Sequence, residues 1–308
     1  MPFLGELSAL FTACLWSGSA MVFASATKRA GSFQVNVTRL ILAAVYLVLL
    51  IVLMPLDVNL SGTQLLNLSI SGVIGLALGD TFLFKAFQEI GARISMLIMS
   101  VAPAIAAMLA YFVLGETLSV VGVLGIAITV FGVSIVVLER SADASQRISP
   151  YGSTTSERVV DLTTSGIVYA SLAAIGQGAG LVFAKMAFRE SEVNWFVATA
   201  IRIIASLVLL LPVAVMTKRY NNPIRMFVQD RKAFLLTAVG SVLGPFLGIS
   251  FSLIAIEHTK VGIAATIMAI VPILMLPLVR IIYKEKLTWR AILGACTAVA
   301  GVAVLFLR

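Results

Sequence analysis

Charged residues are scarce in this chain of 308 residues: Asp, Glu, Lys and Arg together make up 12% of it. That is about half the share found in an ordinary soluble domain. Apolar residues make up 60%, and the mean hydropathy is +1.06. So little polar material cannot cover a water-soluble globule, and the same shortage excludes a disordered, collagen-like or coiled-coil chain. The composition therefore predicts an integral membrane protein.

Cysteine and histidine are also rare. Cys14 and Cys296 each lie within an apolar run, so neither a disulfide framework nor a zinc-type spacing follows. The single histidine, His258, excludes a multi-histidine metal centre. The sequence contains no nucleotide-binding glycine loop, nucleophile elbow or paired acidic motif. We therefore expect no metal, no cofactor and no enzymatic activity.

Basic residues outnumber acidic ones by 22 to 14, which gives a net charge of +8. The sequence shows no basic face with interleaved aromatic residues, so we expect no nucleic-acid partner. Most basic residues instead occupy short links between apolar runs. This pattern is typical of the cytoplasmic loops of a membrane protein, which face anionic lipid.

Ten uncharged or nearly uncharged apolar windows each approach the ~20 residues that cross a bilayer as a helix. They are 4–26, 34–54, 65–88, 92–113, 120–138, 164–187, 194–216, 233–256, 261–282 and 290–307. The alternation typical of barrel strands is absent, so we expect an all-α integral membrane fold with ten transmembrane helices. The first window resembles a signal peptide, but Lys28 and Arg29 follow it rather than precede it, so we expect a retained helix.

A long polar stretch divides these windows into two sets of five, and the two sets are related in sequence. A shift of 169 residues aligns the segment from about 71 to 138 with the second half without a gap. The matched pairs include Gly75 with Gly244, Gly79 with Gly248, Pro103 with Pro272, and Glu116 with Glu285. We therefore expect a first repeat at 1–138, a polar linker at 139–163 and a second repeat at 164–308.

Because each repeat holds an odd number of windows, the second repeat would enter the membrane from the opposite side. Such inverted repeats place a site near the midplane between them and can open to either side by exchanging conformations. The even-numbered links and the termini carry only Arg189, Lys260 and Arg308, and the odd-numbered links carry most of the other basic residues. The positive-inside rule then predicts cytoplasmic odd links and extracytoplasmic termini. This arrangement favours a transporter.

Four of the charged residues inside the windows stand out, since a charge costs about 2.5–3.5 kcal/mol at a helix centre. Arg39, Asp80 and Lys85 belong to the half of the bilayer that faces the odd links, with Arg39 and Asp80 at similar depth. Arg202 lies deep in the seventh window, entering from the opposite side. These residues predict either a polar pocket for a zwitterionic or anionic solute, or an Arg39–Asp80 pair that only fixes packing, with Lys85 reaching the interface.

Pro103 and Pro272 stand in the middle of equivalent windows. Each removes one backbone donor and frees the carbonyl four residues earlier, at Met99 and Met268. In lipid such carbonyls need a partner or a water-filled cavity, so we expect kinked helices that line a cavity and flex. The alternative is a bend accommodated by packing alone.

Two further sets of matched residues suggest structural roles. Glycines at small-xxx-small spacing predict close helix packing, and they are Gly75, Gly79, Gly244 and Gly248. Glu116 and Glu285 follow the prolines by thirteen residues and open the next helix. We expect each to cap that helix, since an acid there meets the positive end of the helix dipole.

Uncharged polar and aromatic residues within the windows complete the candidate solute-binding set: Trp16, Asn36, Ser95, Gln177 and Thr266. The alternative for each is a hydrogen bond between helices. Trp16 and Gln177 lie near matched positions in the first window of each half.

Several of these residues together resemble the EamA family of the drug/metabolite transporter superfamily, over nearly the whole chain. The resemblance is carried by Trp16-Ser17-Gly18-Ser19, Arg39, Leu78-Gly79-Asp80-Thr81, and the doubled series Pro103, Glu116, Leu118, Gly125 and Pro272, Glu285, Leu287, Gly294. It implies a ten-helix carrier in which the third, fourth, eighth and ninth helices line a cavity and the first, second, sixth and seventh surround and gate it. The second copy departs from the pattern, with Gly176-Gln177-Gly178 in place of the tryptophan motif.

From these features we expect a plasma-membrane carrier that exports a small polar, amino-acid-like solute by alternating access. Asp80 is the residue able to couple a proton. A lipid or lipid-linked sugar flippase and a membrane-embedded enzyme are the alternatives. The sequence leaves open whether protons drive transport and whether the protein forms a homodimer.

Overall fold

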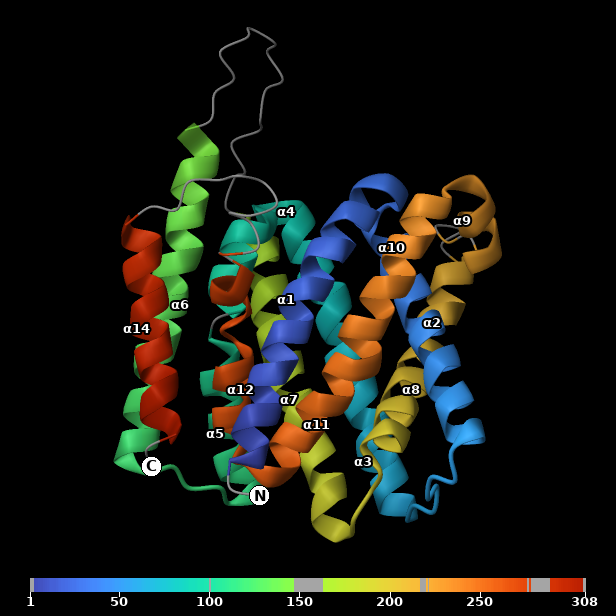
Figure 1. Cartoon of the computed structure of the whole chain (residues 1–308), viewed down its shortest axis with the longest axis horizontal. Coiled ribbons are helices and arrows are strands. Elements are labelled where there is room, and N and C mark those ends of the chain that lie inside the picture. The colour runs from blue at the N-terminus through green and yellow to red at the C-terminus, as the bar shows by residue number, and fades with distance from the viewer. Residues whose placement is uncertain are drawn as a thin grey trace, which may run out of the picture.

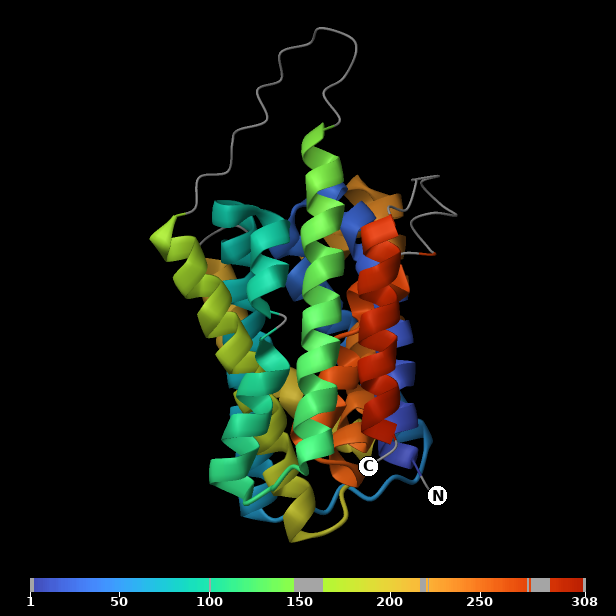
Figure 2. The ribbon, with the colours of Figure 1, turned by 90° about the vertical axis from the view of Figure 1, so that its left-hand side faces the viewer.

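The computed structural model describes residues 3–99, 101–146, 163–216, 220, 222–275, 277 and 289–306. These residues form a bundle of helices, and no strand occurs within them (Figure 1). The N- and C-terminal ends of the chain lie at one end of the bundle, which we call the terminal end (Figures 1 and 2). The opposite end, where the first helix turns into the second, is called the loop end.

The described residues of the first half form seven helical elements. They are α1 (Leu4–Ala30), α2 (Ser32–Leu53), α3 (Gly62–Gly72), the π-helix η1 (Val73–Gly79), α4 (Asp80–Met99), α5 (Ala102–Leu114) and α6 (Val120–Gln146). Local chemistry sets some of these boundaries. Gly31, with φ of 85°, separates α1 from α2, and Gly115, with φ of 64°, ends α5. Ser61 and Gln64 form a reciprocal capping box at the start of α3.

The described residues of the second half form eight helical elements. They are α7 (Thr164–Glu190), α8 (Trp195–Met216), α9 (Pro223–Gln229), α10 (Arg231–Ser241), the π-helix η2 (Val242–Gly248), α11 (Ile249–His258), α12 (Val261–Met268) and α14 (Trp289–Phe306). Asp230 caps α10, and its carboxylate accepts hydrogen bonds from the Ala233 amide and from Nε of Arg29.

Six helices in the described part of the chain are long and apolar enough to cross a membrane. They are Leu4–Thr27, Phe33–Leu53, Gly62–Leu83, Thr164–Glu190, Trp195–Met216 and Arg231–His258. Four shorter apolar helices accompany them, at Ala102–Leu114, Val120–Ile135, Val261–Met275 and Ile292–Phe306. The predicted all-helical, multi-pass membrane architecture is therefore confirmed, whereas ten complete crossings remain a prediction.

The two π-helices record the relationship between the halves. η1 and η2 are both seven residues long, and both of their bounds differ by 169 positions (242 − 73 and 248 − 79). That is the shift found in the sequence. π-helices are rare and concentrate at functional sites. Two of them at equivalent positions therefore indicate a shared structural device rather than a local irregularity.

The two halves run in opposite directions through the bundle. α1 leaves the terminal end and α7 leaves the loop end (Figures 1 and 2). The run from α3 through η1 climbs from the terminal end, and the run from α10 through η2 descends to it (Figure 1). Chain directions of this kind are those of an inverted repeat.

Both prolines mark broken helices rather than kinks, which corrects the expectation for Pro103 and Pro272. α4 ends at Met99 and α5 begins at Ala102, so Pro103 lies in the first turn of a new helix. α12 ends at Met268, and helix resumes at residues 271–275, which again places the proline in a first turn. A proline is tolerated there because the first turn needs no amide donor.

Candidate functional site

A cavity of about 620 Å³ lies between the two halves of the bundle. Its walls come from α1, α2, η1, α4, α5, α6, α7, η2, α11 and α12. On α1 the lining residues run only from Trp16 to Thr27, and on α12 none precedes Ala265. The cavity therefore begins near mid-depth and extends toward the loop end, away from the terminal end.

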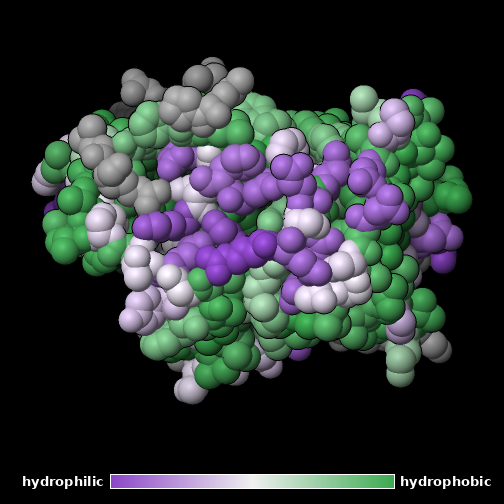
Figure 3. Space-filling view, turned by 90° about the horizontal axis from the view of Figure 1, so that it is seen from below, coloured by the Kyte–Doolittle hydropathy of each residue, from purple (hydrophilic) through white to green (hydrophobic). Residues whose placement is uncertain are grey.

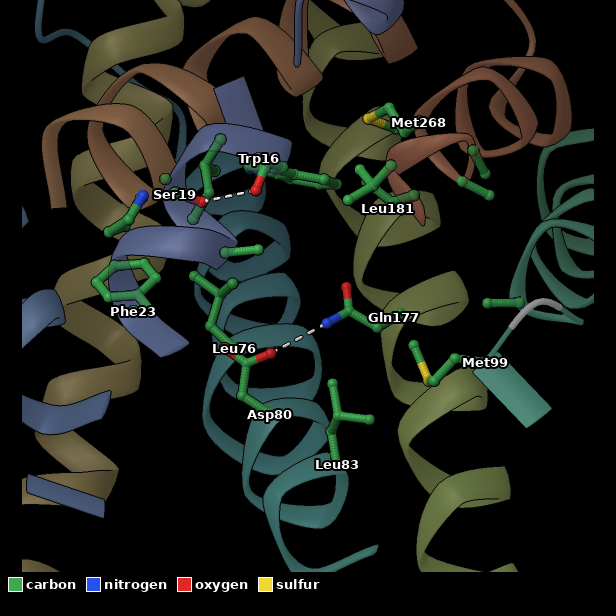
Figure 4. A pocket seen from close by; sticks show the side chains of 18 of the residues that line it. Trp16, Ser19, Phe23, Leu76, Asp80, Leu83, Met99, Gln177, Leu181 and Met268 are labelled. Atoms are coloured by element: carbon green, nitrogen blue, oxygen red, sulfur yellow. Dashed lines mark hydrogen bonds between the residues drawn. The ribbon is translucent and has the colours of Figure 1, made fainter. Parts of the chain in front are cut away.

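A cluster of polar side chains occupies one wall of this cavity. Nη2 of Arg39 lies 2.5 Å from Oδ2 of Asp80, and Nε of the same arginine donates to Asn36 Oδ1 at 2.9 Å. Gln177 donates from Nε2 to the other carboxylate oxygen of Asp80 at 3.1 Å (Figure 4). The Arg39 guanidinium also lies over the Phe23 ring, 5.4 Å from its centroid. α1, α2, α4 and α7 thus converge on a single ion pair.

Glycines make this convergence possible. A Cβ on Gly176 would lie 3.2 Å from the Cα of Gly79, so α7 passes almost in backbone contact with η1. This approach carries the next residue of α7, Gln177, to Asp80, which is the first residue after η1. Gly75 packs in the same way against Gly180, where a Cβ on Gly180 would lie 3.0 Å from the Gly75 Cα.

The remaining walls of the cavity are mostly apolar. Trp16 packs against Gly248, where a Cβ would lie 2.4 Å from the indole Nε1. Met99 and Met268, the last residues of two broken helices, face the cavity (Figure 4). Other apolar lining residues include Leu40, Leu76, Leu83, Leu181, Ile249 and Val271. A charged wall opposite apolar walls suits an amphipathic ligand.

The structure brings ten of the predicted residues to the cavity. They are Trp16, Asn36, Arg39, Asp80, Met99, Pro103, Gln177, Gly244, Met268 and Pro272. Four other candidates do not line it: Lys85, Ser95, Arg202 and Thr266. Lys85 is exposed because five α-helical residues after Asp80 turn it to another face, and its ammonium lies over the Tyr169 ring. Thr266 is buried and donates to the Gly262 carbonyl of its own helix.

Arg202 is buried beside the cluster instead. Its residue is only 4% exposed, and its Nε and Nη1 atoms have no hydrogen-bond partner. Its backbone packs tightly on Gly72, where a Cβ would lie 2.1 Å from the Arg202 carbonyl oxygen. Its Nη2 atom lies against Gly75, one π-turn before Asp80.

Below the cavity, an apolar plug separates it from the terminal end. Six buried residues form this plug: Ala106, Ala110, Leu114, Val182, Val261 and Ala265. They come from α5, α7 and α12, so residues from both repeats close the bundle. On these helices, no residue that lines the cavity lies closer to the terminal end than the plug.

Glu116 joins helices of both repeats at this closed end, and its contacts correct the expectation that it caps the next helix. Its carboxylate accepts the amide of Val261 at 2.8 Å and so caps α12 of the other repeat, not the next helix along the chain. Oε1 of Glu116 also lies 3.1 Å from Nζ of Lys185, whose ammonium donates to the Thr259 carbonyl at 2.6 Å. The matched Glu285 lies outside the described residues. We call Glu116, Lys185 and the Val261 amide the latch.

Further polar contacts surround the latch at the same end of the molecule. Nζ of Lys260 donates to the Thr117 carbonyl, and the Thr259 hydroxyl donates to Oε1 of Glu6 at 2.9 Å. Nη1 of Arg189 donates to the Leu114 carbonyl at 2.6 Å and so satisfies the end of α5. Figure 3, which views this end, shows polar side chains gathered across the middle of an otherwise apolar surface.

Two important residues went unrecognised in the sequence. Lys185 lies inside the predicted window 164–187, and its charge there was the signal that could have found it. Phe23 carries no signal of its own, since an aromatic residue in an apolar window is ordinary. The resemblance assigned α1, α2 and α7, the first, second and sixth windows, to the helices that surround and gate the cavity, and all three supply lining residues.

Within the described residues, no group of three or more His, Cys, Asp or Glu side chains could hold a metal ion.

Comparison with known proteins places the chain in a family. The curated proteins contain no match. A solved structure titled only "Crystal structure of protein" shares 16% sequence identity at a TM-score of 0.77, and the alignment covers 98% of this chain and 96% of that one. That likeness shows the fold alone. The model of the EamA-like transporter family matches twice, at residues 3–138 and 164–307. The chain therefore belongs to the EamA-like transporter family, whose members are membrane transporters and not enzymes.

Proposed function

We propose that the protein carries a small amino-acid-like solute across the plasma membrane by alternating access. The observation that carries this proposal is the Arg39–Asp80–Gln177 cluster on one wall of a largely apolar cavity between the repeats. A volume of about 620 Å³ falls within the ~300–1,000 Å³ of small-molecule sites. Arg39 offers a partner for a carboxylate and Asp80 one for an ammonium group, while the apolar walls accept a side chain.

Export is the direction that we propose. The cavity extends toward the loop end, and the link at Lys28 and Arg29 belongs to the basic, odd-numbered set. Under the positive-inside rule that end is cytoplasmic and both termini are extracytoplasmic. The state described here would then accept solute from the cytoplasm, while the latch and plug keep the other side closed. For the solute to leave on the extracytoplasmic side, the latch must open after the cavity has bound the solute.

A ligand screen tests the proposed solute class directly. We expect purified protein to gain thermal stability from one or more amino acids, because a ligand that binds only the folded state raises its melting temperature. Nucleotides, sugars and lipids form the comparison panel. Uptake of the stabilising compounds into proteoliposomes then tests transport. Stabilisation by lipids alone would replace the carrier proposal with a flippase.

The role of Asp80 is tested with the same vesicles. If Asp80 couples a proton, Asp80→Asn abolishes the dependence of uptake on a pH gradient. Asp57→Asn makes the same chemical change at an exposed carboxylate in the link between α2 and α3, and serves as the matched control. Gradient-dependent uptake that persists in Asp80→Asn would remove this residue from the coupling mechanism.

A further inference from the structure

Arg202 is held in a position that packing alone does not account for. A buried guanidinium with two unpartnered nitrogen atoms is costly, because each lost hydrogen bond leaves a desolvated donor. Two glycines nevertheless make room for Arg202 in this position. Gly72 admits the Arg202 backbone, and Gly75 leaves room for Nη2, which would lie 3.7 Å from a Cβ at that position.

Asp80 is the nearby group that could use these free donors. The π-helix η1 places Asp80 one i→i+5 turn beyond Gly75, on the side where the Arg202 guanidinium lies. A guanidinium and a carboxylate placed in this way attract each other. At Gly75 the helix presents no side chain to stand between them. In the present structure, however, both carboxylate oxygens of Asp80 are engaged by Arg39 and Gln177.

The relationship between the two repeats bears on this arrangement of charges. Arg39 and Arg202 are matched residues of the second helix in each half, whereas the position matching Asp80 holds Ile249. The bundle therefore contains two equivalent arginines and one carboxylate between them. In this structure Arg39 lines the cavity and Arg202 is buried away from it. When inverted repeats exchange conformations, the arginine that lines the cavity exchanges too.

We propose that Asp80 changes partner during the transport cycle, pairing with Arg39 when the cavity faces the loop end and with Arg202 when it faces the terminal end. Arg202 is thus a positioning residue for the second state. Because one arginine is paired with the carboxylate and the other is buried without a carboxylate partner in each state, the electrostatic cost of the two states is similar. Two states of similar free energy are what a carrier needs in order to alternate. This inference rests on the proposed alternating access, but not on the identity of the solute.

A labelling experiment without any solute tests the exchange. The reporter is Thr27→Cys, at a position where the cavity approaches the loop end. The two exposed native cysteines are first replaced, as Cys14→Ala and Cys296→Ala. The probe is a hydrophilic maleimide added to detergent-solubilised protein, in which both ends are accessible, and the rate of labelling reports how often the loop end is open. Asn59→Cys, in an exposed link, reports the reactivity of the reagent itself.

Opposite effects are expected for the two arginines. Arg39→Gln removes the partner of the present state, so labelling at residue 27 slows by about threefold or more as the population shifts. Arg202→Gln removes the partner of the other state, so labelling holds or rises, and Arg202→Lys, which keeps the charge, stays near the wild-type rate. In Asp80→Asn protein both effects shrink to less than half, because no carboxylate remains to exchange.

The proposal is overturned if the two arginine substitutions shift labelling in the same direction, if Arg39→Gln leaves it unchanged, or if the effects persist in full in Asp80→Asn. Each variant is first shown to be monodisperse, and Asn59→Cys must label at one rate throughout. A protein that transports none of the tested solutes would sink the proposed function while leaving this labelling result intact, so the two failures are distinguishable.

Discussion

Removal of the Glu116 charge should open the terminal end of the protein. Glu116 is the residue through which the α5–α6 link, α7 and α12 are joined, and its side chain is only 7% exposed. In Glu116→Gln the amide oxygen still accepts the Val261 N–H, but the ion pair with Lys185 is lost. The ammonium keeps its hydrogen bond to Thr259, so the loss is smaller than for a fully orphaned charge.

The expected size of the effect follows from the loss of this ion pair alone. A hydrogen bond to a charged group contributes about 1.5–3 kcal/mol, and we take ~2 kcal/mol for the latch. This weakens the state that is closed at the terminal end and not the whole fold, so it moves the ratio of the two states by roughly thirtyfold. The reporter is Ala110→Cys, which lies in the apolar plug and is 1% exposed.

Maleimide added from the terminal side should therefore label Ala110→Cys faster in Glu116→Gln, by between ~3-fold and ~30-fold. Lys185→Met should give a similar increase, and the double variant less than the sum, since the second change finds its partner already gone. Glu192→Gln makes the same substitution at an exposed glutamate of the same end and should change nothing. An unchanged rate in Glu116→Gln, or an equal rise in Glu192→Gln, would refute the latch.

Two other predictions concern stability. Arg29 and the Ala233 amide hold the pKa of Asp230 below its usual value, so this carboxylate stabilises the fold above the unfolded pKa of about 3.9 and loses that contribution as the pH falls through the folded pKa. The melting temperature of wild type should exceed that of Asp230→Asn at neutral pH, and the difference should vanish in acid; a constant difference would contradict the pairing. Gly72→Ala drives a Cβ onto the Arg202 carbonyl and should lower the melting temperature by an amount equivalent to about 1–3 kcal/mol. Gly62→Ala, with open space around its Cβ, is the control, and equal melting temperatures for the two variants would contradict the packing.

The sequence predicted well how deep a residue lies in the bilayer, but it predicted poorly which way the side chain faces. The depth of a residue in the bilayer follows from counting along an apolar window, so Arg39 and Asp80 were placed at one level and do form an ion pair. Which face of a helix a residue occupies depends on 100° per residue and on the rotation of each helix against its neighbours. That is why Lys85 was counted with Asp80, although it faces outward over Tyr169.

Contacts between the repeats were the other blind spot. Repetition revealed that Glu116 has a structural role, but the helix that it caps lies 145 positions away and in the opposite repeat. Internal similarity identifies equivalent residues, and it carries no information about which residue of one copy touches the other. The matched prolines show the same division: their position in both halves was evident, whereas the interruption of both helices just before the prolines was not.

The most direct test of the account is a pair of distances measured by electron paramagnetic resonance, across the two ends of the bundle, in protein reconstituted with a transported solute. One pair of spin labels joins Ala30 to Thr164 at the loop end, and the other joins Thr117 to Glu192 at the terminal end, so that each pair links the two repeats. We predict that solute lengthens the distance at the terminal end and shortens the one at the loop end. Distances that change together in the same direction, or that stay fixed while transport proceeds, would contradict a cavity opened alternately by two inverted halves.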